Sequence, residues 1–161
     1  MALADSTFAC LSFLEDETCQ LFELMMKRAE DAEIRLLLDI ILQETRKHRE
    51  LLKHLSAVFG EAAIVSSREC EKMGEWFKQA VALTRSVKAE VQRGMDTAEA
   101  ARRLIDFERD VGEEYVAQAH AAARASVQEN QAVRTVLESI ARDEKGHAEL
   151  LQLVIEIASQ K

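Results

Sequence analysis

Residues 133–158 read VRTVLESIARDEKGHAELLQLVIEIA, and their apolar side chains recur at the period of an α-helix. One face of that helix collects every third or fourth residue: Val133, Leu137, Ile140, Glu144, His147, Leu151 and Ile155. Most of this face is the apolar stripe that packs into a core. Glu144 and His147 are ionisable, one turn apart and on the same face. Burying a carboxylate and an imidazole costs several kcal/mol unless a partner compensates them.

A metal ion is one such partner, because a carboxylate oxygen and a neutral imidazole nitrogen both bind iron, manganese or zinc. In four-helix bundles, Glu-x-x-His is the pattern that builds a dinuclear metal site into the interior. The alternative is a surface glutamate next to a hydrogen-bonded core histidine. The four-residue pattern alone leaves both readings open.

The composition predicts an all-α protein of one domain. The chain has 161 residues, of which 48% are hydrophobic and 31% charged, as in an ordinary globular domain. It contains no proline and five glycines, and good helix formers dominate it. No convincing strand pattern is present.

Charge and hydropathy exclude two classes of partner. A net charge of -8 argues against a nucleic-acid surface, and no apolar run approaches the roughly 20 residues that cross a membrane. The N-terminal stretch lacks the pattern of a secretory signal, so we expect a cytoplasmic protein. The three cysteines, Cys10, Cys19 and Cys70, form no zinc-type spacing, and we expect reduced thiols.

Periodicity and turn residues divide the chain into two helical hairpins, residues 6–59 and 97–159, joined by a connecting helix within residues 67–93. Gly60 and Gly94 are helix stops. Serine or aspartate followed three residues later by glutamate predicts a capping box before each later helix, at Ser66/Glu69, Asp96/Glu99 and Ser126/Glu129. The expected helices are Ser6–Arg28, Glu33–Phe59, Ser67–Gln92, Thr97–Arg124 and a final one that frays near Lys161.

Three of these helices carry one ionisable residue on an otherwise apolar stripe: Glu15 in the first, His48 in the second and Glu108 in the fourth. Each has a simpler reading. Glu15 belongs with Asp16 to a solvated acidic stretch, and His48 is a hydrogen-bonded core residue. His54 lies off the stripe and should be exposed to solvent.

An internal repeat links these separate signals. Residues 41–52, ILQETRKHRELL, align without a gap with residues 140–151, IARDEKGHAELL. Glu15 precedes Phe22 by seven residues, as Glu108 precedes Tyr115. Each half is therefore a helix with an inward Glu followed by a helix with an inward His. Two such hairpins packed antiparallel form a four-helix bundle whose candidate ligands meet at its middle.

These motifs resemble the ferritin-like superfamily, in particular its rubrerythrin-like branch, and the resemblance spans essentially the whole chain. It implies a four-helix bundle with a long crossover between its second and third core helices, which suits the connecting helix. It also implies two iron ions. By that resemblance the ligand positions are those of Glu15, His48, Glu108, Glu144 and His147.

One position departs from the family pattern. Thr45 stands where the resemblance implies a second bridging glutamate, and a hydroxyl is a poor substitute for a bridging carboxylate. Glu44 is its neighbour, and on a helix it lies about 40° from His48. Glu44 is thus a candidate metal ligand. It is equally a candidate for a hydrogen bond to a ligand, or for a surface ion pair.

Three functions follow from these expectations. The first is a di-iron oxidoreductase that reduces peroxide or oxidises ferrous iron, with Tyr115 hydrogen-bonded to a ligand. Because no rubredoxin-like four-cysteine module is attached, it would need an external electron donor. The second is a metal-binding bundle with an incomplete site, for which manganese or zinc is as suitable as iron. The third is a metal-free oligomeric scaffold. The resemblance implies a homodimer.

Overall fold

The computed structural model of the chain describes residues 6–125 and 131–161, with the backbone only for residue 116 and residues 118–125. This part of the chain contains five α-helices, one 3₁₀ turn and no strand, which confirms the all-α prediction. None of the described helices is long and apolar enough to span a lipid bilayer.

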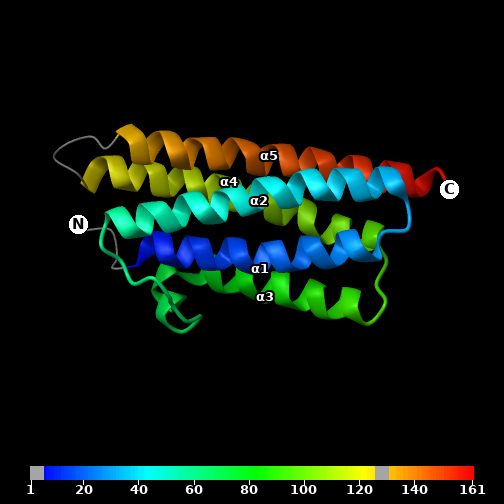
Figure 1. The fold of residues 1–161 in the computed structure, drawn as a ribbon, viewed down its shortest axis with the longest axis horizontal. Helices are drawn as coiled ribbons and strands as arrows, with labels where there is room; N and C mark the ends of the chain where they lie inside the picture. Colours follow the sequence, from blue (N-terminus) through cyan, green and yellow to red (C-terminus); the bar gives the residue numbers. More distant parts are fainter. Residues whose placement is uncertain (1–5, 126–130) are drawn as a thin grey trace.

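Four long helices form a bundle of two antiparallel pairs (Figure 1). The first pair is α1 (Thr7–Arg28) with α2 (Ala32–Val58), and the second is α4 (Thr97–Ala125) with α5 (Gln131–Ser159). The pairs meet mainly where α2 packs against α5, and α1 also contacts α4.

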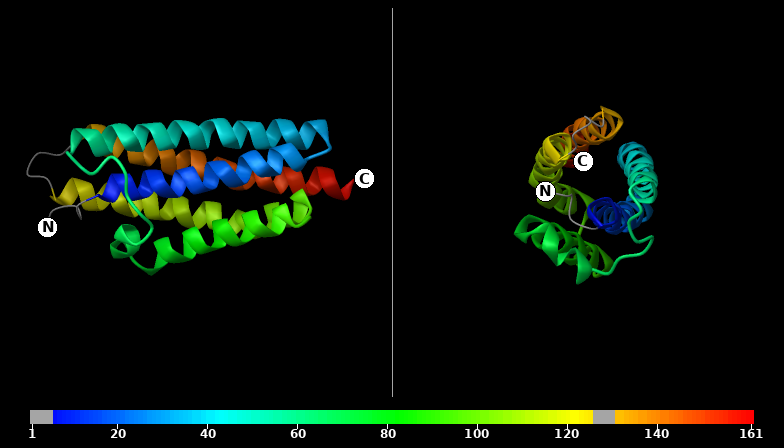
Figure 2. Two further views of the ribbon diagram at one scale, coloured as in Figure 1. Left: turned by 60° about the horizontal axis from the view of Figure 1, so that its bottom comes forward. Right: turned by 90° about the vertical axis from the view of Figure 1, so that its left-hand side faces the viewer.

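The remaining helix, α3 (Glu75–Gln92), packs on the outside of the bundle against α1 (Figure 2). It is shorter than the bundle helices, and together with the segments on either side it returns the chain from the end of α2 to the start of α4 (Figure 1). As a result α2 and α4 run in the same direction.

Most helix boundaries fall within one residue of the predicted ones. The side chain of Asp31 begins α2, since its Oδ1 accepts hydrogen bonds from the backbone N–H of Glu33 (2.8 Å) and of Ile34 (3.1 Å). The predicted start of α4 at Thr97 is confirmed, and Asp96 Oδ1 accepts from the N–H of Glu99 at 2.9 Å. The predicted cap at Ser126/Glu129 lies outside the described residues.

The predicted start of the third helix at Ser67 is wrong. Ser66 and Glu69 do form a reciprocal cap, with Ser66 N–H donating to Glu69 Oε2 (2.6 Å) and Glu69 N–H to Ser66 Oγ (3.3 Å). This cap begins only a 3₁₀ turn, η1 (Glu69–Met73). Gly74 then adopts φ +103°, a conformation that ends the turn, and α3 begins at Glu75.

The expectation of three reduced thiols is also wrong. Cys10 of α1 and Cys70 of η1 form a disulfide across 60 residues, while Cys19 is free and buried. The segment between α2 and α3 also contacts α1 through Glu61. Glu61 accepts hydrogen bonds from the N–H groups of Phe8 (3.2 Å) and Ala9 (2.8 Å) in the first turn of α1. The chain that follows α2 is therefore fixed to the start of α1.

The core lies along the stripes that the periodicity predicts. Phe8, Leu11 and Phe22 of α1 and Leu137 and Ile140 of α5 are all fully or almost fully buried. His54, predicted to lie off the stripe, is exposed. The helical period that aligns Glu108 and Tyr115 on α4 also predicts Ala122 on that face, but the side chain of Ala122 is not among those described. The ionisable members of the stripes are buried with the apolar ones, and they define the candidate site.

Candidate metal centre

Four helices bring five of the predicted ligand residues together inside the bundle. Glu15 comes from α1, His48 from α2, Glu108 from α4, and Glu144 and His147 from α5. Each side chain is buried, with at most 3% of its residue surface exposed. The solvated readings of Glu15 and Glu144 therefore do not hold.

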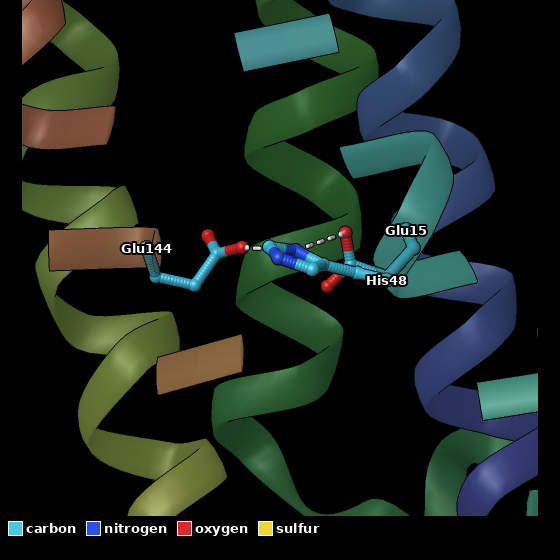
Figure 3. A group of neighbouring side chains, drawn as sticks. All are labelled: Glu15, His48 and Glu144. Carbon is cyan, nitrogen blue, oxygen red and sulfur yellow. Dashed lines mark ion pairs between the residues drawn. The ribbon is translucent and has the colours of Figure 1, made fainter. Parts of the chain in front are cut away.

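The first cluster consists of Glu15, His48 and Glu144 (Figure 3). His48 lies between the two carboxylates, with its Nδ1 atom 2.9 Å from Glu144 Oε1 and 3.9 Å from Glu15 Oε2. A cation about 2 Å from each of its ligands needs donor atoms about 3 to 4 Å apart. These spacings fit one cation between the three residues.

The second cluster consists of Glu108, Glu144 and His147. His147 Nδ1 lies 3.4 Å from Glu108 Oε2 and 3.7 Å from Glu144 Oε1. Glu144 belongs to both clusters, and its Oε1 atom faces both histidines. A carboxylate in that position can bridge two cations.

Hydrogen bonding leaves these clusters unsatisfied. Among the described residues, the buried side-chain nitrogen and oxygen atoms that lack any hydrogen bond all belong to the site: His48 Nδ1, His147 Nδ1, Glu144 Oε1 and both carboxylate oxygens of Glu108. The Nδ1 atoms of both histidines thus lie close to carboxylate oxygens without the geometry of a hydrogen bond. Unpaired buried polar atoms are rare, because each costs about 1–3 kcal/mol. Their convergence on one place provides a set of donor atoms that could bind cations.

The outer nitrogens of both histidines, by contrast, have partners. His48 Nε2 lies 2.9 Å from Asp143 Oδ2, and His147 Nε2 lies 2.8 Å from Glu44 Oε2. A proton on Nε2 donates to the carboxylate and leaves the Nδ1 lone pair directed at the cluster. Each histidine is held by a carboxylate from the helix across the α2–α5 contact.

This arrangement defines the role of Glu44 in the structure. Of the roles expected for it, the hydrogen bond to a ligand is the one observed, and Glu44 belongs to neither cluster. In the internal repeat Glu44 aligns with Asp143, so the two outer carboxylates are equivalent. Sequence reasoning did not identify Asp143 as a site residue, although the alignment with Glu44 was a signal for it. It also missed Lys47, whose Nζ lies 2.7 Å from Asp143 Oδ2.

Thr45 contributes nothing to the clusters. Its hydroxyl donates to the backbone carbonyl of Ile41 at 2.8 Å, a local bond along α2. The side chain is 1% exposed, so it fills space inside the bundle. The structure therefore has one central carboxylate, Glu144, where the repeat offers two positions.

Tyr115 lies in the site, as predicted. Its hydroxyl donates a hydrogen bond to Glu15 Oε1, which joins α4 of the second hairpin to α1 of the first. The residue that matches Tyr115 in the repeat is Phe22, which has no hydroxyl. Glu15 thus has a phenol donor, whereas neither carboxylate oxygen of Glu108 has a hydrogen bond among the described residues.

The pKa values of the three carboxylates shift in different directions: that of Glu144 is lowered, and those of Glu15 and Glu108 are raised. Burial would raise the pKa of Glu144, but the flanking His147 and His48 outweigh burial and hold it well below its usual range. Burial, with the nearby charge of Glu144, raises the pKa of Glu15 to about 7. The same two causes raise the pKa of Glu108 well above its ordinary value.

The histidines shift in the opposite sense to that expected from burial. Burial lowers the pKa of His147, but Glu108 and Glu144 outweigh it and raise the pKa to about 11. For His48, Glu144 and Glu15 likewise outweigh burial and raise the pKa. Without metal, protons therefore take the place of cations in compensating the central carboxylate.

The donor set is three carboxylates and two imidazoles, a combination of oxygen and nitrogen ligands that suits iron, manganese or zinc. Fully ionised, the three carboxylates carry three negative charges, which a pair of divalent cations would more than balance. No family model, curated protein or solved structure matches the chain, so the site has to be interpreted from its own geometry.

Proposed function

We propose that this chain is a ferritin-like, rubrerythrin-like protein that binds a pair of metal ions, iron above all, between its two hairpins. The observation that carries the proposal is Glu108. Its side chain is completely buried, and among the described residues neither of its carboxylate oxygens has a hydrogen bond. A cation at this position would satisfy it.

The topology supports the proposal. Ferritin-like bundles have one long crossover connection, and their metal ligands are a Glu from two helices and Glu-x-x-His from the other two. Here α3 makes a crossover, α1 and α4 each supply a Glu, and α5 supplies Glu144 and His147. On α2 the motif keeps His48 and has Thr45 in place of the Glu.

The residues have distinct roles in this proposal. Glu15 and His48 would hold one cation, Glu108 and His147 would hold the other, and Glu144 would be shared by both. Bound iron would supply electron exchange with oxygen or peroxide, either to reduce peroxide or to oxidise ferrous iron. Tyr115 keeps Glu15 in one orientation through its hydroxyl. Peroxide turnover would require electrons from an external donor.

A metal-free scaffold explains less of the site. It requires the inward carboxylates to be satisfied by histidines or arginines, and the contacts of His48 and His147 with Glu144 agree with that. Glu108 does not, because its closest cationic partner is His147 Nδ1 at 3.4 Å, without a hydrogen bond. We therefore favour metal.

Thr45 favours a second candidate, a metal-binding bundle with an incomplete site and no turnover. With one bridging carboxylate, the site holds its cations less symmetrically than the resemblance implies, and zinc or manganese would then suit it as well as iron. This candidate shares the ligands of the first and differs in its reaction with oxygen.

Anaerobic loading with ferrous iron, followed by a pulse of oxygen or peroxide, tests the proposal. We expect about two irons per chain and a spin-coupled diferric product by Mössbauer spectroscopy. Metal binding without oxidation would select the second candidate. A chain that binds neither iron, manganese nor zinc would overturn the proposal. Sedimentation of the same sample would test the expected homodimer.

A further inference from the structure

Gly112 of α4 lies directly against the central carboxylate residue. A Cβ atom added to this glycine would be 3.2 Å from Glu144 Cβ and 3.2 Å from the backbone carbonyl oxygen of Ala141. Both distances are shorter than ordinary carbon contacts, so any side chain here would displace Glu144 or move α4 from α5. The backbone of Gly112 is helical, so the reason for glycine here is space.

The other glycine within this hairpin provides the contrast. Gly146 of α5 is two residues from Glu144, yet an added Cβ would meet no atom within 4 Å. A side chain is therefore accommodated at 146 and not at 112. Two helical glycines on the same hairpin thus differ only in what lies beside them.

The internal repeat gives Gly112 a counterpart in the first hairpin. The alignment of Glu15 with Glu108 and of Phe22 with Tyr115 puts Cys19 at the position of Gly112. The alignment of the second helices puts Thr45 at the position of Glu144. Cys19 and Thr45 are both buried. The hairpin with the longer side chain on its second helix thus has glycine on its first, and the hairpin with the shorter one has cysteine.

We infer that Gly112 is a positioning residue that seats Glu144 between the two cations, and that Cys19 fills the corresponding space beside Thr45. The packing between the helices of each hairpin then determines how many bridging carboxylates the site accepts. The inference rests on the proposed metal site and specifies it further: the site is built for one central carboxylate, and the absence of the second is matched by Cys19.

The direct test replaces each glycine by alanine and titrates the folded proteins with Co²⁺, whose visible spectrum reports ligand geometry. Gly112→Ala should weaken Co²⁺ binding by about tenfold or more, as for other residues that orient metal ligands, and should alter the spectrum. Gly146→Ala, the matched control, should leave both unchanged. Circular dichroism confirms that each variant is folded. Equal affinity and identical spectra for the two variants would overturn the inference.

A second set of variants does not depend on Gly112. Thr45→Glu alone should lower Tm, because the longer side chain meets Cys19. Cys19→Gly combined with Thr45→Glu should recover part of that loss, so that the two changes are coupled in a double-mutant cycle. The double variant should also change the Co²⁺ spectrum of the site. Additive effects on Tm, or a Thr45→Glu protein as stable as the wild type, would contradict the role of Cys19.

The wild-type titration distinguishes a failure of the proposed function from a failure of the role inferred for Gly112. If the wild-type chain binds no Co²⁺, iron or zinc, the proposed function fails. If the wild type binds metal and Gly112→Ala binds it identically, only the positioning role of Gly112 fails.

Discussion

The two hairpins carry the same framework for the candidate metal site, but only the second supplies its shared central carboxylate. Both have an inward Glu on the first helix, an inward His on the second and an outer carboxylate that reaches the other hairpin's His. Three of the matched positions at which they differ lie in or near the site: Thr45 against Glu144, Cys19 against Gly112, and Phe22 against Tyr115. At each, the second hairpin has the residue that builds the centre of the site.

The comparison teaches that the asymmetry is coordinated. Glu144 requires the space at Gly112, and Tyr115 stabilises the glutamate of the opposite hairpin. The first hairpin has instead the features that hold the fold, namely the disulfide and the Glu61 cap of α1. The second hairpin supplies the residues at the centre of the bundle, and the first is attached to the segment that leads to α3.

The largest effect should come from Glu144→Ala, which removes the residue shared by both clusters. We expect loss of both metals, and with them the stabilisation that ligand binding gives the native state, about 4 kcal/mol at a thousandfold excess over Kd. Metal analysis and thermal unfolding with and without metal measure this. Glu156→Ala, a change of an exposed glutamate on the same helix, is the control. Undiminished metal content in Glu144→Ala would rule out the bridging role.

The pH dependence of metal binding should be steep. The pKa of His147 is raised to about 11 and that of Glu15 to about 7, and the pKa values of His48 and Glu108 are also raised, so cations compete with protons for these groups. Loading should therefore release protons, and affinity should rise with pH.

Both subsites should contribute to this proton release, because the pKa of Glu15 is raised to about 7 and that of Glu108 is raised well above its ordinary value. Metal titration in weak buffer with a pH indicator checks this expectation. Glu15→Ala and Glu108→Ala should each reduce the number of protons released on loading. Loading without proton release would contradict the protonated metal-free state.

The same groups determine whether the stability of the metal-free protein rises or falls with pH. The pKa of His147 is raised to about 11, so its contribution to folding is complete below pH 6.5 and is lost toward pH 11. The raised pKa of Glu15 likewise favours the folded state below about pH 4.5 and loses that effect as pH passes 7. The metal-free protein should therefore weaken from pH 6 to pH 9, and metal should remove that trend.

The disulfide distinguishes the first hairpin from the second in stability. Joining Cys10 to Cys70 closes a loop of about sixty residues, for which the chain-entropy model gives about 4 kcal/mol. Replacing both cysteines by serine should lower Tm by about 10 °C, while metal content stays at the wild-type level. Serine at the free Cys19 is the comparison. An unchanged Tm under reducing and oxidising conditions would show that the bond contributes nothing.

Substitutions of the two outer carboxylates, Glu44 and Asp143, test a feature that both hairpins share. Glu44→Gln and Asp143→Asn should each weaken metal binding by about tenfold to a hundredfold, because each removes the charge that orients a histidine. Asp143→Asn also leaves Lys47 without its partner, a contact exposed enough to matter little. Isothermal titration gives both affinities. A large effect of Glu44→Gln on the number of metals, rather than on affinity, would instead make Glu44 a direct ligand.

The smallest effects should come from exchanging the aromatic pair. Tyr115→Phe removes the donor to Glu15 and should cost about 1–3 kcal/mol of metal-free stability, since that carboxyl group is buried. Phe22→Tyr should gain up to about 1 kcal/mol by giving Glu108 a donor. Chemical unfolding of the metal-free proteins measures both. The same sign for the two changes would refute the equivalence of Tyr115 and Phe22.

Much of this arrangement can be predicted from the sequence because helical periodicity is local. The stripes of α1, α2 and α5 identify the buried faces, and the repeat predicts that Glu15, His48, Glu108 and Glu144 meet. The start of α3 could not be predicted, because the cap at Ser66 is the same for a 3₁₀ turn as for a long helix, and Gly74 decides between them. The disulfide and the Asp143 contact depend on how distant segments pack. Residue spacing along the chain does not encode that packing.

The outer contacts also bear on how quickly the buried charges can change. His48 is sealed from water, but it touches Asp143, which touches the half-exposed Lys47. His147 likewise touches Glu44, whose side chain is 37% exposed. Each imidazole is therefore connected to solvent through a single carboxylate group. These contacts offer protons a way out of the centre while the helices stay packed, so we expect proton exchange at the site without opening of the bundle.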